Sequence, residues 1–350
     1  ARGVKADIWD IVAHNAQIEF GYYTAWLDRQ SGKPAASGAP DRCSAFVAVG
    51  SMTRDGRVVI GHNNWSGYLE GARWNIIFSI RPKTGHRILM DGYPGFIHSG
   101  DDFGVTSAGL AITETTISGF HGFDPQGVPE FVRARQAMQY ASSVDEFAEL
   151  MKKGNNGGYA NAWLVADVRR NEIGRLELGL KHVTWEKKRD GYFAGANFPI
   201  NPKLAAEETD FDLKNAGLSA NARRERWEQL MKQWEGRVNL AAGKRFLADH
   251  HDAFAGTPDS PNERTLCGHN EISERGMPPW QEPFAPAGAV QAKIADATMV
   301  GRMQFEAVMG HPCGMPFKAS EHLRKYPQFG WMKNHLRDLP SPGWARFNLR

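Results

Sequence analysis

The sequence predicts an α+β domain in which strands and helices come in separate blocks. Strand patterns and helical periodicity follow one another as strands, helices, strands and helices, an order that favours layered α+β packing over the strict alternation of a doubly wound sheet. Glycine is abundant, with 37 of 350 residues, which is typical of many tight turns between strands. Hydrophobic residues make up 41% and charged residues 23%. The chain can therefore bury a sizeable core.

The first elements are expected to form a helical segment of their own, residues 1–42. Apolar side chains at helical spacing over residues 4–28 predict one amphipathic helix or a pair. Residues 31–41 are rich in Gly, Pro, Ser and Ala and predict a flexible connector that ends just before Cys43. Residues 43–350 are expected to form the main domain, with a loop-rich C-terminal extension.

The main domain is expected to begin with strands and to return to them after two helices. Apolar runs and turn residues predict strand pairs at 45–49 with 57–61, 74–80 with 87–90, and 104–107 with 110–117. Helical spacing predicts helices at 128–140 and 144–153. Later strands are predicted at 162–167, 175–180, 182–185 and 192–196, and later helices at 219–234 and 240–254.

Charge and hydropathy exclude several classes of protein. The formal net charge is only +3, so neither nucleic acid nor an anionic membrane is an expected partner. No stretch approaches about 18 consecutive apolar residues, and no transmembrane helix is expected. The chain has no phosphate-binding loop, no plausible dinucleotide fingerprint and no Gly-x-Ser-x-Gly elbow. Nucleotide chemistry is not indicated, and we expect no cofactor.

The three cysteines cannot all pair, so at least one thiol is unpaired within a monomer. Cys267 and Cys313 lie in similar Cys-Gly loops and leave two interpretations open, a disulfide in an oxidising compartment or small buried side chains. The chain begins without Met, and no apolar leader segment follows. We expect that any export signal was removed or never existed, and we favour a periplasmic or secreted location without deciding it.

Cys43 is the first candidate for chemistry because it stands where the connector meets a predicted buried strand. A thiol needs a base or a depressed pKa before it attacks at neutral pH. If the peptide bond before Cys43 were cut, the new α-amino group, with an ordinary pKa of about 7.7–8.0, could be that base. The alternative is an inert cysteine in a strand.

Four ordered motifs extend this argument beyond one cysteine. They are Cys-Ser-Ala-Phe-Val-Ala-Val-Gly from 43, Gly-His-Asn-Asn-Trp-Ser-Gly-Tyr from 61, Gly-Tyr-Pro-Gly-Phe-Ile-His-Ser-Gly-Asp-Asp-Phe from 92, and Gly-Leu-Ala-Ile-Thr-Glu-Thr-Thr from 109. A further block, Gly-Gly-Tyr-Ala-Asn-Ala-Trp, starts at 157. Together they resemble the phospholipase B-like proteins and, more distantly, the isopenicillin-N acyltransferase-like cysteine hydrolases. Both belong to the N-terminal nucleophile (Ntn) superfamily. The resemblance covers residues 43–240 well and the C-terminal third loosely.

The resemblance implies a four-layer αββα sandwich with Cys43 at the start of an inner strand. It also implies a precursor that cuts itself between Arg42 and Cys43, giving pieces of 42 and 308 residues. A Gly/Pro-rich connector suits such a site, because it can present its end to the thiol.

The resemblance also assigns residues around the nucleophile. Many relatives in the wider superfamily have Arg or Gln at the place of His62 and Asp three residues later, whereas the phospholipase B-like branch has His and Trp, as in His62 and Trp65 here. This departure puts the usual amine–carboxylate contact in doubt, and Trp65 is expected to wall the acyl pocket. Asn161 is the expected oxyanion donor, with backbone N–H groups near Asn64 completing the hole. The alternatives are a strand-end histidine bonded to backbone and a turn asparagine.

Two more residues are placed near the site by the same resemblance. Arg223 lies on a predicted helix and resembles a family arginine, with Arg226 one turn along as the alternative and a solvated charged face as the ordinary explanation. Thr116 is expected to reach the pocket.

Two other constellations are interpreted as structural. Asp101, Asp102 and Glu114 invite an acid/base interpretation, but in the resemblance they are signature residues that form structural hydrogen bonds. His250-His251-Asp252 invites a metal interpretation. Adjacent histidines on a helix point about 100° apart, and no partner cluster with ligand spacing is evident, so no metal site is expected.

The sequence therefore predicts a self-processing cysteine hydrolase that cleaves an amide or ester acyl bond through an acyl-enzyme on Cys43. Amide chemistry is favoured, by analogy, over phospholipid deacylation or acyl transfer. The expected partner is a small-molecule or lipid acyl substrate, and a homo-oligomer is left open. The rivals are an Ntn-fold binding protein that has lost catalysis and an uncleaved Cys–His protease that uses one of the 12 histidines.

Overall fold

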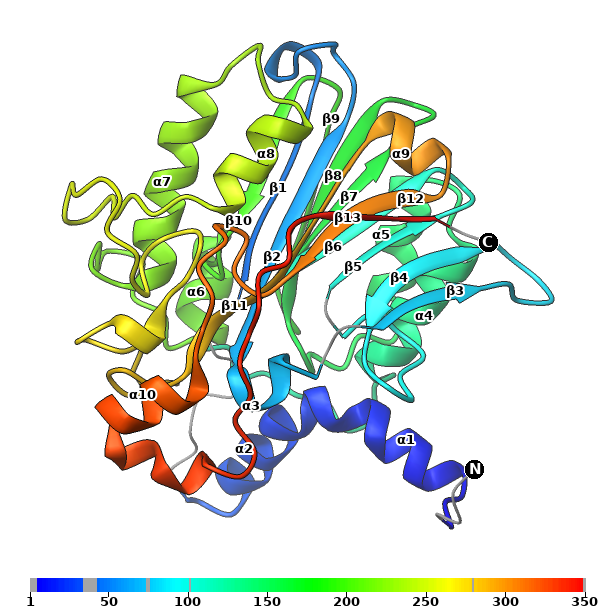
Figure 1. The fold of residues 1–350 in the computed structure, drawn as a ribbon. Coiled ribbons are helices and arrows are strands. Elements are labelled where there is room, and N and C mark those ends of the chain that lie inside the picture. Colours follow the sequence, from blue (N-terminus) through cyan, green and yellow to red (C-terminus); the bar gives the residue numbers. More distant parts are fainter. Residues whose placement is uncertain (1–4, 34–42, 74–75, 101, 279, 349–350) are drawn as a thin grey trace.

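Two antiparallel sheets stacked face to face form the centre of the protein (Figure 1). The structure is a computed structural model and describes residues 5–33, 43–73, 76–100, 102–278 and 280–348. Residues 34–42, which include most of the connector expected at 31–41 and Arg42 of the expected cleavage site, therefore lie outside the described residues.

The first sheet has the strand order β10-β1-β2-β11-β12-β13. Its strands are β1 (Cys43–Val49), β2 (Val59–Gly67), β10 (Gly191–Gly195), β11 (Ala287–Asp296), β12 (Gln304–Met309) and β13 (Ala345–Asn348). The hairpin predicted from 45–49 and 57–61 is confirmed, since β1 pairs with β2.

The second sheet runs in the order β3-β4-β5-β6-β7-β8-β9. Its strands are β3 (Ile76–Ile80), β4 (Ile88–Gly92), β5 (Phe103–Thr106), β6 (Leu110–Thr116), β7 (Asn161–Asp167), β8 (Glu172–Leu178) and β9 (Val183–Lys188). Consecutive strands pair throughout, so this sheet is a simple meander and its predicted hairpins are confirmed.

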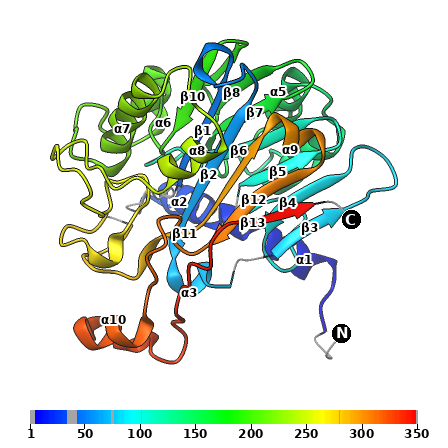
Figure 2. The ribbon, with the colours of Figure 1, turned by 45° about the horizontal axis from the view of Figure 1, so that its top comes forward.

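Three apolar clusters show that the molecule has four layers. One cluster, including Val47 and Leu164, fills the space between the sheets. A second packs the first sheet against α7 (Ser219–Gln233) and α8 (Leu240–Leu247). A third packs the second sheet against α4 (Glu130–Tyr140) and α5 (Val144–Lys152). The expected αββα sandwich is confirmed, and Figures 1 and 2 show helices on both outer faces.

The N-terminal segment is helical, as predicted, with α1 (Ile8–Ala16), a short 3₁₀ turn (Gln17–Glu19) and α2 (Phe20–Gln30). Asp7 begins α1 with a capping box, because its side chain accepts from the backbone N–H of Asp10 while the Asp10 carboxylate accepts from that of Asp7. Figure 1 shows both helices at one end of the sandwich. Asn15 of α1 donates to the Gly95 carbonyl at 3.1 Å, so the segment contacts the sandwich directly.

The C-terminal third is more regular than its sequence indicates. It contains the short helices α9 (Ala297–Gly301) and α10 (Ala319–Lys325). Two other short helices, α3 (Tyr68–Gly71) and α6 (Pro202–Glu208), lie earlier in the chain. The expectation of a loop-rich extension is wrong for β11, which pairs with both β2 and β12 inside the first sheet. Small residues and several preceding prolines hide this strand. Among the described residues, none of the helices combines the length and apolar character that a membrane span requires.

Candidate active site

Cys43 opens β1 with its side chain between the two sheets. Side chains alternate along a strand, and Ala45 and Val47, on the same face as Cys43, belong to the core between the sheets. Cys43 pairs with Asn64 of β2, so the two side chains share that face. The cysteine is 1% exposed. The start of an inner strand thus holds the thiol in place, as the sequence predicts.

A cavity of about 350 Å³ reaches Cys43 from the end of the sandwich that α1 and α2 occupy. Its volume is near the lower end of the range for small-molecule sites, about 300–1,000 Å³. The walls combine aromatic rings with a few polar groups: Gln17, Ile18, Gly21, Tyr22, Cys43, Asn64, Trp65, Glu70, Tyr93, Phe96, Gly100, Asp102 and Tyr159. The N-terminal helical segment therefore supplies part of the wall, and Trp65 is among the lining residues.

The backbone nitrogen of Cys43 is held by a side chain from another strand end. It donates to Asn197 Oδ1 at 3.0 Å, and Asn197 Nδ2 donates to the Thr116 carbonyl at 2.8 Å. Asn197 is the second residue after the end of β10. It has a left-handed backbone with φ 71°, a conformation that asparagine tolerates better than most residues. This asparagine thus connects β1 with β6 at the position where an N-terminal amine would lie.

Arg223 of α7 brings a buried positive charge to the same place. Its Nη2 donates to Asn197 Oδ1 at 3.1 Å, and its Nη1 donates to the Cys43 carbonyl. Its guanidinium lies 4.3 Å from the Trp65 ring centroid, a cation–π contact. The structure thus places Arg223 beside Cys43, whereas Arg226, the alternative, pairs with Asp249 at 2.6 Å.

His62 lies on the same strand face, one step farther inside the sandwich. A ring nitrogen of His62, Cys43 Sγ and a carboxylate oxygen of Asp102 all lie within 4.8 Å of one another. Burial lowers the pKa of His62 well below 6.5, and the positive charge of Lys293 on the neighbouring strand lowers it further. His62 is therefore a neutral imidazole at pH 7.

Two carboxyl groups and a tyrosine form a second buried group beside the thiol. Tyr159 Oη lies 3.1 Å from Asp102 Oδ2 and 2.9 Å from Glu114 Oε1. Burial raises the pKa of Glu114 to about 8, although hydrogen bonds from Asp102 and Tyr159 oppose the shift. Glu114 is thus protonated at neutral pH. These contacts support the structural interpretation of Asp102 and Glu114, while Asp101 lies outside the described residues.

Replacing Glu114 by Gln is expected to change how stability depends on pH. The pKa of Glu114 is about 8 in the folded protein, against an ordinary value of 4.5, so its stabilising contribution is complete below pH 4.5 and is lost as the pH rises to 8. E114Q stays neutral and escapes this loss. Relative to E114Q, the wild type should lose up to about 1.4 kcal/mol of unfolding free energy per pH unit in this window. Chemical denaturation at several pH values measures it.

Glu149→Gln is the matched control, because the Glu149 side chain is 72% exposed. Its difference from wild type should stay constant over the same pH range. A constant difference for E114Q as well would show that Glu114 ionises normally, contrary to its buried position.

Asn161 and Thr116 are direct partners at the ends of β7 and β6. By strand alternation their side chains belong to the face with Ile112 and Trp163, which packs against α4 and α5. Asn161 is not among the described residues that line the Cys43 cavity. Among the described residues, neither of its side-chain amide atoms has a hydrogen-bond partner. These neighbours do not support an oxyanion role for Asn161, which stays a prediction.

Sequence reasoning missed Asn197 and the contact between Tyr159 and the two acids. One structural feature is common to three of these residues and cannot be recognised from the sequence. It is a left-handed backbone, with φ of 65° at Asp102, 51° at Tyr159 and 71° at Asn197. Non-glycine residues held in this conformation tend to occur at functional sites. In the sequence, by contrast, Asn197 is one more asparagine after a strand.

The argument that His250 has no partner cluster is wrong. His251 and Asp252 are not its partners, but Cys267, His269 and Cys313 are, with their candidate ligand atoms and that of His250 all within 4.8 Å of one another. The structure describes both cysteines as thiols rather than a disulfide.

The fold and this site define a class, an αββα protein with a buried cysteine at the start of an inner strand. A family model described as Phospholipase B matches residues 3–345. The chain belongs to the phospholipase B family, which confirms the resemblance found in the sequence.

Individual members of the family are similar to this chain at low sequence identity. Putative phospholipase B-like 1 of Caenorhabditis elegans is 26% identical over 330 residues, covering 83% of this chain and 57% of that protein. Phospholipase B of Crotalus adamanteus is 24% identical over 311 residues, covering 81% and 54%. The chain thus spans about half the length of the curated relatives it matches. Among solved structures, a conjugated bile acid hydrolase of Clostridium perfringens matches with a TM-score of 0.43 and 11% identity, over 76% of this chain and 89% of that one.

Proposed function

We propose that the protein is a self-processing cysteine hydrolase of the Ntn type that cleaves acyl amide or ester bonds through an acyl-enzyme on Cys43. One observation carries the proposal. The backbone nitrogen of Cys43 lies 3.0 Å from Asn197 Oδ1 and next to the Arg223 guanidinium, and Cys43 lies at the wall of a cavity. Asn197 would orient an α-amine freed at this position, and the positive charge of Arg223 would lie next to it.

The charge of Arg223 matters for the protonation state of that amine. A neighbouring cation and burial both disfavour an ammonium ion, so both lower the pKa of the amine from its ordinary value of about 7.7–8.0. The amine is then neutral near pH 7 and can accept the thiol proton. Efficient general bases have pKa values near the working pH.

The proposed reaction first acylates Cys43 and then hydrolyses the acyl-enzyme. The Cys43 Sγ–H gives its proton to the α-amine, and Sγ bonds to the substrate carbonyl carbon. The tetrahedral oxyanion collapses, and the leaving amine or alcohol takes the proton from the α-ammonium group. Water then attacks the thioester and gives one proton to the α-amine. The α-ammonium group passes this proton to the leaving Cys43 thiolate, which releases the carboxylic acid and restores the thiol and the neutral amine. Acyl transfer would replace this water by another nucleophile.

For the oxyanion, Asn64 is better placed than Asn161. Asn64 is the register partner of Cys43, shares its strand face and lines the cavity. A carboxamide N–H aimed at the developing charge typically contributes about 10²–10³ in kcat. We therefore assign this role to Asn64.

The same thiol would process the precursor. Cys43 Sγ would attack the Arg42 carbonyl carbon, and the peptide nitrogen of Cys43 would leave as the amine, giving a thioester. Water would hydrolyse that thioester to an Arg42 carboxylate and the mature N-terminal cysteine. The family resemblance at residues 43–50 supports this step.

After cleavage the N-terminal piece is expected to stay bound. Asn15 accepts from the Ile97 N–H at 2.8 Å and donates to the Gly95 carbonyl at 3.1 Å, while the buried Glu19 accepts from Asn156 Nδ2 at 3.1 Å. Tyr22 lies in an apolar cluster with Phe120. We predict that the two pieces co-elute in native gel filtration and separate only after denaturation. Separation under native conditions would show that the segment is shed.

The size of the cavity bears on the substrate. About 350 Å³ is too small to enclose a phospholipid with two acyl chains, so a small acyl group or one end of a chain enters. Paired amides and esters with the same acyl chain, tested over increasing chain length, would define the preference. We expect amide turnover with short or medium acyl groups. Turnover of diacyl phospholipids alone would favour the lipid deacylase.

A second candidate mechanism uses His62 as the base in an uncleaved chain. The contact of its ring with Cys43 Sγ, within 4.8 Å, is the observation in its favour. A neutral imidazole of His62 could also accept the thiol proton.

An alkylating probe that leaves Cys43 unlabelled would instead favour a binding protein without catalysis.

A further inference from the structure

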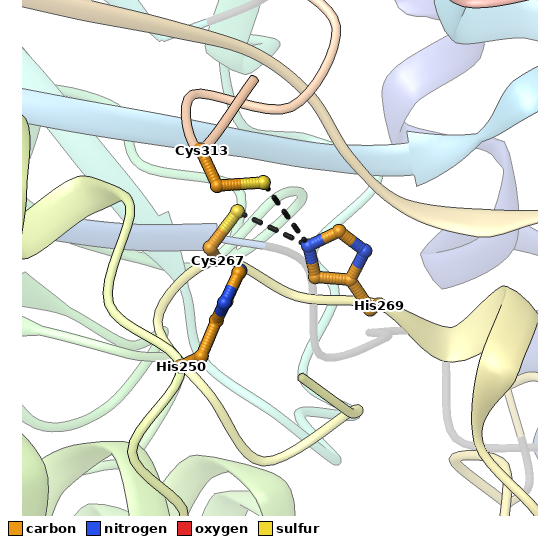
Figure 3. A group of neighbouring side chains, drawn as sticks. All are labelled: His250, Cys267, His269 and Cys313. Atoms are coloured by element: carbon orange, nitrogen blue, oxygen red, sulfur yellow. Dashed lines mark hydrogen bonds between the residues drawn. The ribbon is translucent and has the colours of Figure 1, made fainter. Parts of the chain in front are cut away.

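Four metal-ligating side chains, His250, Cys267, His269 and Cys313, come together in one group (Figure 3). His250 follows α8, Cys267 and His269 flank Gly268 in the segment before β11, and Cys313 follows β12. Three loops far apart in the chain therefore converge on one point. Cys267 and His269 are fully buried, and only 12% of the His250 side chain is exposed.

Their spacing matches a tetrahedral site. Cys267 Sγ lies 3.3 Å and Cys313 Sγ 3.6 Å from His269 Nε2, and the ligand atoms of all four residues lie within 4.8 Å of one another. With bonds of about 2.3 Å to sulfur and about 2.0–2.1 Å to nitrogen, tetrahedral zinc places sulfur and nitrogen ligands about 3.6 Å apart. Small movements of the side chains would complete the coordination.

We propose that His250, Cys267, His269 and Cys313 bind one structural Zn²⁺ ion. Two cysteines and two histidines are a typical zinc ligand set, and four protein ligands leave no open position for a substrate. The two thiols would bind as thiolates and release their protons to solvent, while both histidines would bind as neutral imidazoles.

The far nitrogen of each histidine already has a carboxylate partner. His269 Nδ1 lies 2.8 Å from Glu271 Oε1, and His250 Nδ1 lies 3.2 Å from Asp259 Oδ1. Carboxylates accept hydrogen bonds, so each Nδ1 carries a proton, and Nε2 is the nitrogen that each ring offers to a metal. Histidines that bind a metal almost always donate their other N–H in this way. The Glu271 carboxylate is itself held by Tyr68 Oη at 2.7 Å.

His250 Nε2 gives an independent indication of a ligand. It is buried, and among the described residues it has no hydrogen bond of good geometry, while the Cys313 thiol lies close enough to interact with the His250 ring. A buried nitrogen without a well-formed hydrogen bond destabilises the fold, and a bond to a metal would remove that cost. In Figure 3 the His250 ring lies beside Cys267 on the side opposite Cys313.

A disulfide between Cys267 and Cys313 accounts for less of this arrangement. It would bring the sulfur atoms to about 2.05 Å and use both of them. The two histidines, each with its carboxylate, would then have no ligand to share. The metal site accounts for all four residues and both carboxylates.

The proposed ion would stabilise the wall of the Cys43 cavity as well as the three loops. A Cβ on Gly268, between two of the ligands, would lie 2.3 Å from the Trp65 ring, so this loop packs directly on Trp65. Trp65 in turn lies against Arg223. The site is thus a structural support next to the Cys43 site and does not depend on the function proposed above.

The first test uses the wild-type full-length chain. We expect elemental analysis to find about one zinc per chain. Cobalt(II) exchanged into the site should give thiolate charge-transfer bands and the strong visible absorption of tetrahedral coordination. Peptide mass spectrometry after alkylation should show Cys267 and Cys313 protected until a chelator is added. Metal-free protein in which Cys267 and Cys313 are alkylated at the same rate with and without chelator would overturn the proposal. A disulfide between Cys267 and Cys313 would overturn it as well.

Variants give the second test. Cys313→Ser and His250→Ala should each lower the zinc content or affinity at least about tenfold and lower the melting temperature. His251→Ala is the matched control, because it removes the adjacent histidine, which is outside the cluster, and should retain the metal. Equal zinc content in all three variants would refute the assignment. If a variant fails to fold, the cobalt spectrum and the alkylation of the wild type still decide.

Discussion

Replacing Cys43 by Ala is expected to abolish hydrolysis of every acyl substrate that the wild type accepts. The thiol is the only atom at the cavity wall that we assign to attack the carbonyl, and no acyl-enzyme can form without it. Loss of a nucleophile typically lowers kcat by about 10³-fold or more. Initial rates with the best amide substrate, together with mass spectrometry of trapped acyl-enzyme, measure both consequences.

Cys43→Ser is the graded companion of this variant. Its hydroxyl keeps the position of the nucleophile but ionises far less readily, so we expect slow turnover and slow processing rather than none. Both variants should retain the wild-type melting temperature within a few degrees, since the side chain is small. Turnover by Cys43→Ala at the wild-type rate would show that the chemistry lies elsewhere.

Asn197→Asp is expected to move the acidic limb of the pH–rate profile upward. The side chain keeps its shape and an oxygen 3.0 Å from the Cys43 nitrogen, but it adds a negative charge. An opposite charge at this distance favours the ammonium form and raises the pKa of the amine, by about one unit or more. The protonated amine cannot accept the thiol proton, so activity should fall more at pH 6 than at pH 9. The pH dependence of kcat/KM, measured on fully cleaved protein, tests this.

Asn171→Asp is the matched control, because Asn171 is also a left-handed asparagine, with φ 51° in the turn between β7 and β8. Its substitution adds the same charge away from the thiol and should leave the profile unchanged. An unshifted acidic limb in Asn197→Asp would contradict the amine as base and favour His62 in an uncleaved chain.

The parts of this account that the sequence predicted are those with a local pattern. The hairpin of β1 and β2 follows from short apolar runs around Asp55-Gly56, and the helix that carries Arg223 follows from helical spacing. Ser143 is a further local signal, since its hydroxyl accepts from the Glu146 N–H at 3.1 Å and begins α5. Such features depend only on residues that are close together in the sequence.

What the sequence could not predict depends on contacts between distant segments. Asn197 lies 154 residues from Cys43, and only the approach of the end of β10 to β1 makes it a partner. Cys313 is 44 residues from His269, so the cluster with His250 has no recognisable motif spacing. β11 was hidden because it combines small residues with Gln291 and Lys293, and Lys293 is tolerated there by its ion pair with Asp91 at 2.6 Å.

The central claim is that Cys43 becomes an N-terminal nucleophile by cutting its own chain, and a denatured intact mass of the purified 350-residue protein tests it most directly. The account predicts two pieces of 42 and 308 residues that meet between Arg42 and Cys43, and one uncut species for Cys43→Ala. A single active 38.9 kDa wild-type chain that stays uncut on incubation at acidic pH would contradict it.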